Sequence, residues 1–103
     1  MRDIRFRPRA QLDLDSAFTY IALTLDAPQA AKSLVEALYA GIERVADLPE
    51  SGMLFSAPEL AQSYRRILVK SYWIYYTYDD ATLTVWRIFH TSRDIDDCTF
   101  IEL

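Results

Sequence analysis

Three runs of β-branched and aromatic residues in the second half of the chain limit the possible folds more than any other feature. They lie at 65–71, 72–78 and 82–89 and are separated by minimal turns. The segment 79–81, Asp-Asp-Ala, is well suited to a tight reversal between the last two runs. We therefore predict a three-stranded antiparallel meander over the second half of the chain.

The first half of the chain shows one short strand pattern and then two helical patterns. Residues 3–7 alternate between apolar and charged side chains, which predicts a half-buried strand that ends at Pro8. Helices are predicted over 9–25 and 28–46, the second with Pro28 in its first turn. The apolar positions that recur with helical spacing are Leu14, Phe18, Ile21 and Leu25 in the first helix and Leu34, Leu38, Ile42 and Val45 in the second. Because the link between the helices is so short, they should form an antiparallel αα-hairpin.

These elements predict a single α+β domain over residues 1–103. A chain of this length has room for one hydrophobic core. The N-terminal strand should join the antiparallel sheet of the meander, and the helical hairpin should cover one face of that sheet. Residues 47–63, which contain two prolines and a glycine, are predicted to be a connecting loop with one helical turn near Glu59.

The composition argues against a disulfide, a metal site and a membrane span. Cys98 is the only cysteine and His90 the only histidine, so neither an intrachain disulfide nor a structural zinc site is expected, and no metal or cofactor is implied. Cys98 lies in a run of aspartates, whose negative charge disfavours a reactive thiolate. No apolar run approaches the roughly 20 residues of a membrane span, and no signal-peptide core is recognisable, so a cytoplasmic location is expected.

The charges are unevenly distributed along the chain. The formal net charge is −4, which argues against a protein that binds nucleic acid over its whole surface. Basic residues cluster at the start and acidic residues in the last ten positions; the basic ones are Arg2, Arg5, Arg7 and Arg9, and the acidic ones are Asp94, Asp96, Asp97 and Glu102. An acidic end of this kind is expected to be solvated.

The middle run of the meander is aromatic on both of its faces. Trp73 and Tyr75 fall on one face, and Ile74 and Tyr76 fall on the other, whereas the helices can cover only one face. The second face, to which Trp86 of the next run contributes, is expected to be exposed as a partner surface. The alternative is that loops or a dimer contact cover these side chains.

Four local strings span nearly the whole chain. They are RPRAQLDL followed by YIA at 7–22, LPESG at 48–52, YRRILVKSYWIYY at 64–76 and RIFHTSRDI at 87–95. Together with the predicted order of one strand, two helices and three strands, these strings resemble the RelE/ParE superfamily of toxins, and the ParE-like members more than the RelE-like ones. The resemblance implies a cytoplasmic poison that is neutralised by a cognate antitoxin, which wraps an extended or helical segment around the toxin.

The resemblance also indicates where such an antitoxin would bind. A disordered segment that folds on binding can cover a large apolar surface. The expected contacts are the aromatic side chains of the second sheet face, Trp73, Tyr75 and Trp86, and the basic residue Arg65.

The superfamily divides by target. RelE-like members cleave messenger RNA in the ribosome, whereas ParE-like members inhibit DNA gyrase without catalysis. RNA cleavage of this kind needs a base for the ribose 2′-hydroxyl, an acid for the leaving oxygen and cations on the phosphate. The side chains that would serve here are His90, Arg87, Arg66 and Arg93, then Arg65 and Lys70, with Tyr75 or Tyr76 as proton donors.

Two features favour a gyrase-directed, non-nucleolytic toxin. Trp73 stands where RelE-like toxins generally place an arginine, and the chain is acidic overall. The alternatives are a ribosome-dependent mRNA endoribonuclease and an inactive toxin-fold binding module.

Arg87 also has a structural interpretation. It lies inside a strand, where it would pair with Asp13, Asp15 or Asp94 and hold the sheet against the first helix.

Overall fold

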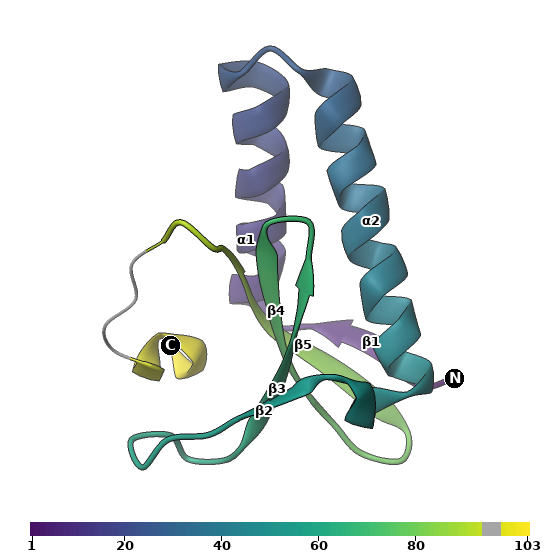
Figure 1. Cartoon of the computed structure of the whole chain (residues 1–103), viewed down its shortest axis with the longest axis vertical. Coiled ribbons are helices and arrows are strands. Elements are labelled where there is room, and N and C mark those ends of the chain that lie inside the picture. The colour runs from purple at the N-terminus through teal and green to yellow at the C-terminus, as the bar shows by residue number, and fades with distance from the viewer. Residues whose placement is uncertain (94–97) are drawn as a thin grey trace.

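The computed structural model describes residues 1–93 and 98–103, which form one five-stranded sheet and a long helical hairpin (Figure 1). The elements are, in chain order, β1 (Asp3–Phe6), α1 (Pro8–Thr19), a π-helical turn η1 (Tyr20–Thr24), α2 (Pro28–Asp47), a 3₁₀ turn η2 (Pro49–Ser51), β2 (Met53–Phe55), β3 (Tyr64–Val69), β4 (Tyr72–Tyr78), β5 (Thr82–His90) and a 3₁₀ helix η3 (Cys98–Glu102). The predicted α+β fold is confirmed.

The sheet has the strand order β1-β5-β4-β3-β2. The predicted meander is confirmed, because β3, β4 and β5 pair antiparallel. The N-terminal strand joins the sheet as predicted, but β1 pairs parallel with β5, so the sheet is mixed rather than wholly antiparallel. No tight turn connects these two strands, so no hairpin loop imposes an antiparallel pairing on them.

The predicted loop over 47–63 contains an additional strand. The three residues of β2 pair antiparallel with the first half of β3 at the sheet edge. Around Glu59 the chain makes a turn rather than the predicted helical turn. The sequence pattern did not reveal β2 because three consecutive apolar residues show no alternation.

The helical hairpin packs on one face of the sheet and forms the main core with it. Pro8 and Pro28 each stand in the first turn of a helix, where a missing N–H removes no intrahelical bond. The buried side chains of this core are Ala10, Leu14, Leu34, Leu38, Ile42, Val45, Ala46, Val69, Ile74, Tyr76, Leu83, Val85 and Ile88. They include every apolar position predicted for the second helix.

The far end of the hairpin extends beyond the sheet (Figure 1). Phe18 and Leu25, which were predicted to belong to the buried stripe of the first helix, are therefore 41% and 54% exposed. The prediction was wrong for these two positions because helical periodicity shows which face is apolar but not how far the covering sheet reaches. Among the described residues, no helix has both the length and the apolar character that a membrane crossing requires.

Candidate functional site

The sheet face opposite the helices carries a second core. Its buried members are Leu60, Tyr64, Tyr75, Phe89 and Ile101, and those packed against them are Phe55, Ala57, Trp73, Trp86, Cys98 and Phe100. They come from the sheet, the β2–β3 loop and η3, so the chain itself covers this face. The prediction of an exposed aromatic face is therefore wrong for Tyr75, which is only 3% exposed, whereas Trp73 and Trp86 are half-buried. The alternative interpretation, that loops cover these side chains, describes Tyr75 correctly.

Specific polar contacts fasten η3 to the sheet. The Glu102 carboxylate accepts hydrogen bonds from the Tyr64 hydroxyl at 2.7 Å and from the Ala61 N–H at 2.9 Å. Burial, and then the nearby Glu102, raise the pKa of Tyr64 above its usual value. The Phe100 ring packs edge-on against Tyr75 and Phe89. Glu102 thus has a structural role, contrary to the prediction of a solvated acidic end; residues 94–97, which include the other acidic positions of that prediction, lie outside the described residues.

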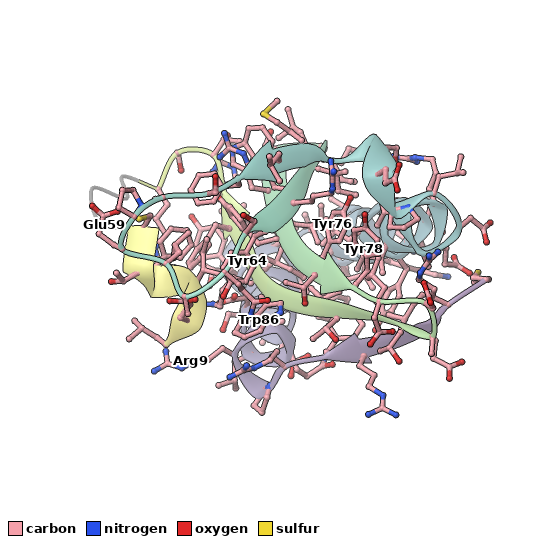
Figure 2. All side chains as sticks on the ribbon, turned by 90° about the horizontal axis from the view of Figure 1, so that it is seen from below. Arg9, Glu59, Tyr64, Tyr76, Tyr78 and Trp86 are labelled. Atoms are coloured by element: carbon pink, nitrogen blue, oxygen red, sulfur yellow. The ribbon has the colours of Figure 1, made fainter. Side chains whose placement is uncertain are left out.

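Trp86 is held by internal contacts. Its indole N–H donates to the Thr77 hydroxyl at 2.8 Å, and the Arg7 guanidinium lies 4.0 Å from the centre of its ring. The Tyr64 ring meets it edge-on, and Figure 2 shows these two side chains side by side near η3. Trp86 is half-buried, so only part of its ring is available to a partner.

Arg87 joins β5 to α1, as one interpretation of the sequence predicted. Its Nε and Nη2 donate to the two carboxylate oxygens of Asp13 at 2.7 and 3.0 Å, and its Nη1 donates to the Phe100 carbonyl at 2.9 Å. Asp13 also accepts the backbone N–H of Ile88 at 3.0 Å. Each nitrogen of the guanidinium therefore has an acceptor within the protein, and Arg87 is not free to bind a phosphate.

Arg65 and Tyr76 also serve the fold. Arg65 donates to the Gly52 carbonyl at 2.8 Å, and the Tyr76 hydroxyl donates to the Pro49 carbonyl at 2.6 Å, so both hold the segment that contains η2. A Cβ at Gly52 would overlap the Tyr76 hydroxyl, which explains the glycine at this position. Tyr76 is fully buried and its proton is already engaged, so it is not placed to donate to a substrate.

Three of the four side chains predicted for RNA cleavage do come together. Arg66, His90 and Arg93 line one pocket of about 240 Å³ at the end of β5. The other lining residues are Phe55, Trp73, Tyr75, Phe89, Thr91, Cys98 and Phe100. Phe55 and Phe100 were missed as candidates, because the one lies on the strand that the pattern did not reveal and the other in the segment predicted to be solvated.

The hydrogen bonds of His90 determine which ring nitrogen can act on a ligand. Its Nδ1 accepts the backbone N–H of Ser92 at 3.0 Å and lies 2.7 Å from the Ser92 hydroxyl. In a neutral imidazole whose Nδ1 accepts, the proton sits on Nε2. His90 therefore offers a donor rather than a base at its other ring nitrogen.

Both arginines of this pocket lie over aromatic rings. The Arg66 guanidinium lies 4.0 Å from the centre of the Trp73 ring and 4.9 Å from that of Phe55, and its Nη1 donates to the Tyr75 hydroxyl at 3.2 Å. The Arg93 guanidinium lies 4.5 Å from the centre of the Phe89 ring. Among the described residues, neither arginine forms an ion pair with a carboxylate. Within residues 1–93 and 98–103, the pocket thus combines two arginines that lack an ion-pair partner with aromatic walls.

The described residues contain no evident metal site. Within residues 1–93 and 98–103, no group of three or more His, Cys, Asp or Glu side chains is arranged to hold a metal ion.

Comparison with known proteins places the chain in a family. The model of the family described as the ParE toxin of the type II toxin–antitoxin system parDE matches residues 4–95. A solved structure described as a chromosomal ParDE TA system from P. aeruginosa is similar in fold, with a TM-score of 0.68 and 16% sequence identity over 89% of this chain and 98% of that one. No curated protein sequence matched the chain.

Proposed function

Because the chain belongs to the family of ParE toxins of type II toxin–antitoxin systems, we propose that it is neutralised by a cognate antitoxin and inhibits DNA gyrase without catalysis. The observation that carries the proposal is the family match, which covers residues 4–95 and so runs from β1 past the end of β5. The resemblance found in the sequence points to the same target.

The arrangement of the predicted catalytic side chains supports a non-nucleolytic mode. Arg87 is bound to Asp13, and Tyr76 is buried with its hydroxyl engaged. His90 presents a donor nitrogen where abstraction of a 2′-hydroxyl proton would need an acceptor. Trp73 stacks on Arg66 at the position where RelE-like toxins carry an arginine.

One observation favours a second candidate, the ribosome-dependent mRNA endoribonuclease. Arg66, His90 and Arg93 line a single pocket, which would place two cations and a donor around one phosphate. This candidate requires His90 to release its contact with Ser92 or another group to serve as the base.

The antitoxin is proposed to bind the part of the aromatic face that η3 leaves open. Leu68 of β3 is 52% exposed and pairs with Trp73 of β4, which is half-buried. The exposed edge of Trp86 would extend this contact. Tyr75 and Arg65, predicted as direct contacts, would support the surface from within, because both are engaged in contacts inside the protein.

Expression of the chain alone is expected to arrest bacterial growth, and co-expression with the antitoxin encoded beside it should restore growth. Leu68→Asp is expected to abolish that rescue, because it places a charge at the proposed apolar contact. Leu12→Asp, at an exposed apolar position of α1, is the matched control and should still be rescued. A folded chain that leaves growth unaffected would contradict the proposal for the toxin, and rescue of Leu68→Asp would contradict the proposed surface.

A further inference from the structure

The pocket lined by Arg66, His90 and Arg93 has a composition that the proposed action on gyrase does not explain. Among the described residues that line it, four side chains carry nitrogen donors, namely Arg66, Arg93, His90 and the indole of Trp73, and none is a carboxylate. Glu59 lies beside the pocket, where its Oε2 accepts a hydrogen bond from the Cys98 thiol at 3.6 Å. The whole chain has a net charge of −4, but the basic side chains of this pocket would attract an anion locally.

Arg66 is the side chain most clearly available for a ligand. A guanidinium has five N–H donors, and in the described structure that of Arg66 makes one hydrogen bond, to the Tyr75 hydroxyl. Its Nε is buried and has no acceptor among the described residues. Arg87, two strands away, has an acceptor for each of its nitrogens, so the two arginines differ in what they can still bind. A guanidinium that lies between aromatic rings, with N–H groups for which the described residues offer no acceptor, is suited to a phosphate or a carboxylate.

His90 adds a second donor of fixed orientation. Because Ser92 occupies Nδ1, the neutral ring presents its Nε2–H and accepts nothing at that atom. The neutral ring and the protonated ring can therefore both donate from Nε2 to an anion. The arrangement suits binding of a phosphate and offers no base for cleaving a phosphodiester.

The aromatic walls indicate what the anion would be attached to. Trp73 and Phe55 flank Arg66, and Phe89 lies under Arg93, so planar surfaces stand next to each cation. Nucleobases stack on aromatic side chains and on guanidinium planes, largely independently of sequence. The pocket volume of about 240 Å³ lies just below the range of about 300–1,000 Å³ for small-molecule sites, which suits a phosphate with part of its nucleoside.

From this geometry we infer that the pocket is a nucleotide-binding site: Arg66, Arg93 and the Nε2–H of His90 bind a phosphate, and the attached base packs against the aromatic wall formed by Trp73 and Phe55. The site binds without cleaving. It does not depend on the target of the toxin, so it can be tested on the purified chain without an antitoxin or gyrase.

Titration of the ¹⁵N-labelled chain with AMP, adenosine and inorganic phosphate tests the inference. AMP is expected to shift the indole N–H signal of Trp73 saturably. The indole signal of Trp86 should stay in place, because Trp86 lies outside the pocket and its N–H is hydrogen-bonded to Thr77. Binding of adenosine as tight as that of AMP would overturn the role of the arginines. Binding of phosphate as tight as that of AMP would overturn the role of the aromatic wall.

Variants of equal charge assign the binding to this pocket. Arg66→Gln is expected to weaken AMP binding about tenfold or more, since a hydrogen bond between charged groups is lost. Arg5→Gln removes the same charge from an exposed position of β1 outside the pocket and should leave binding unchanged. Equal weakening by both variants would show a non-specific charge effect, and an unchanged affinity in Arg66→Gln would overturn the site. Hydrolysis of a dinucleotide by the chain would overturn the conclusion that the site does not cleave.

Discussion

Replacing Asp13 with asparagine is expected to lower the free energy of unfolding by about 3–5 kcal/mol, as when one partner of a buried ion pair is removed. The side chains of Arg87 and Asp13 are 6% and 13% exposed, so the guanidinium would keep its charge in a place with little water. The same change weakens the hydrogen bond that the Asp13 carboxylate accepts from the backbone N–H of Ile88 in β5. Chemical denaturation measures the loss.

Asp15→Asn is the matched control for this experiment. Asp15 lies on the same helix, is exposed, and accepts a hydrogen bond from the side chain of Gln11. Its replacement should change the free energy of unfolding by less than about 0.5 kcal/mol, as is usual for surface substitutions. Replacing both partners, as in Asp13→Leu with Arg87→Met, should recover part of the stability lost by Asp13→Asn, because no unpaired charge remains. Equal stability of Asp13→Asn and Asp15→Asn would show that the ion pair does not hold α1 to the sheet.

Ile101→Ala is expected to cost about 2–5 kcal/mol, the range for truncating a large aliphatic side chain in a core. Ile101 is 1% exposed and packs in the second core with Tyr64, Tyr75 and Phe89. Thermal unfolding, followed by circular dichroism, should show a clearly lowered midpoint.

Leu103→Ala provides the comparison, because Leu103 is 66% exposed and lies only two residues further along the chain. Its truncation should leave the midpoint nearly unchanged. If Ile101→Ala were as stable as the native chain, η3 would not be part of the core, and the aromatic face would be open to partners as the sequence first suggested.

The main core could be predicted from the sequence because it depends on local periodicity. Leu34, Leu38, Ile42 and Val45 repeat at helical spacing, and all four are buried as predicted. The pairing of β4 with β5 could also be predicted locally, because the tight turn over 79–81 connects them. The Asp79 carboxylate stabilises this turn by accepting hydrogen bonds from the N–H groups of Ala81 and Thr82.

The second core could not be predicted because it depends on contacts distant in sequence. Phe100 and Ile101 are two apolar residues in an otherwise acidic end, and only the fold shows that they lie on Tyr75. The same limit applies to the pocket. A register shift between Tyr75 and Tyr76 pairs Tyr75 with Arg87 and Tyr76 with Val85, which leaves Trp86 as an extra residue in β5. A bulge of this kind changes which residues lie opposite each other, and strand alternation does not reveal it.

A supercoiling assay with purified DNA gyrase tests the central claim most directly. The chain is expected to inhibit supercoiling, and the cognate antitoxin is expected to restore it. His90→Ala should inhibit as strongly as the native chain, because no catalytic base is involved. A translating extract run in parallel should then retain intact transcripts. Gyrase that supercoils normally in the presence of the chain, together with transcripts cut in the extract by the native chain but not by His90→Ala, would contradict the account.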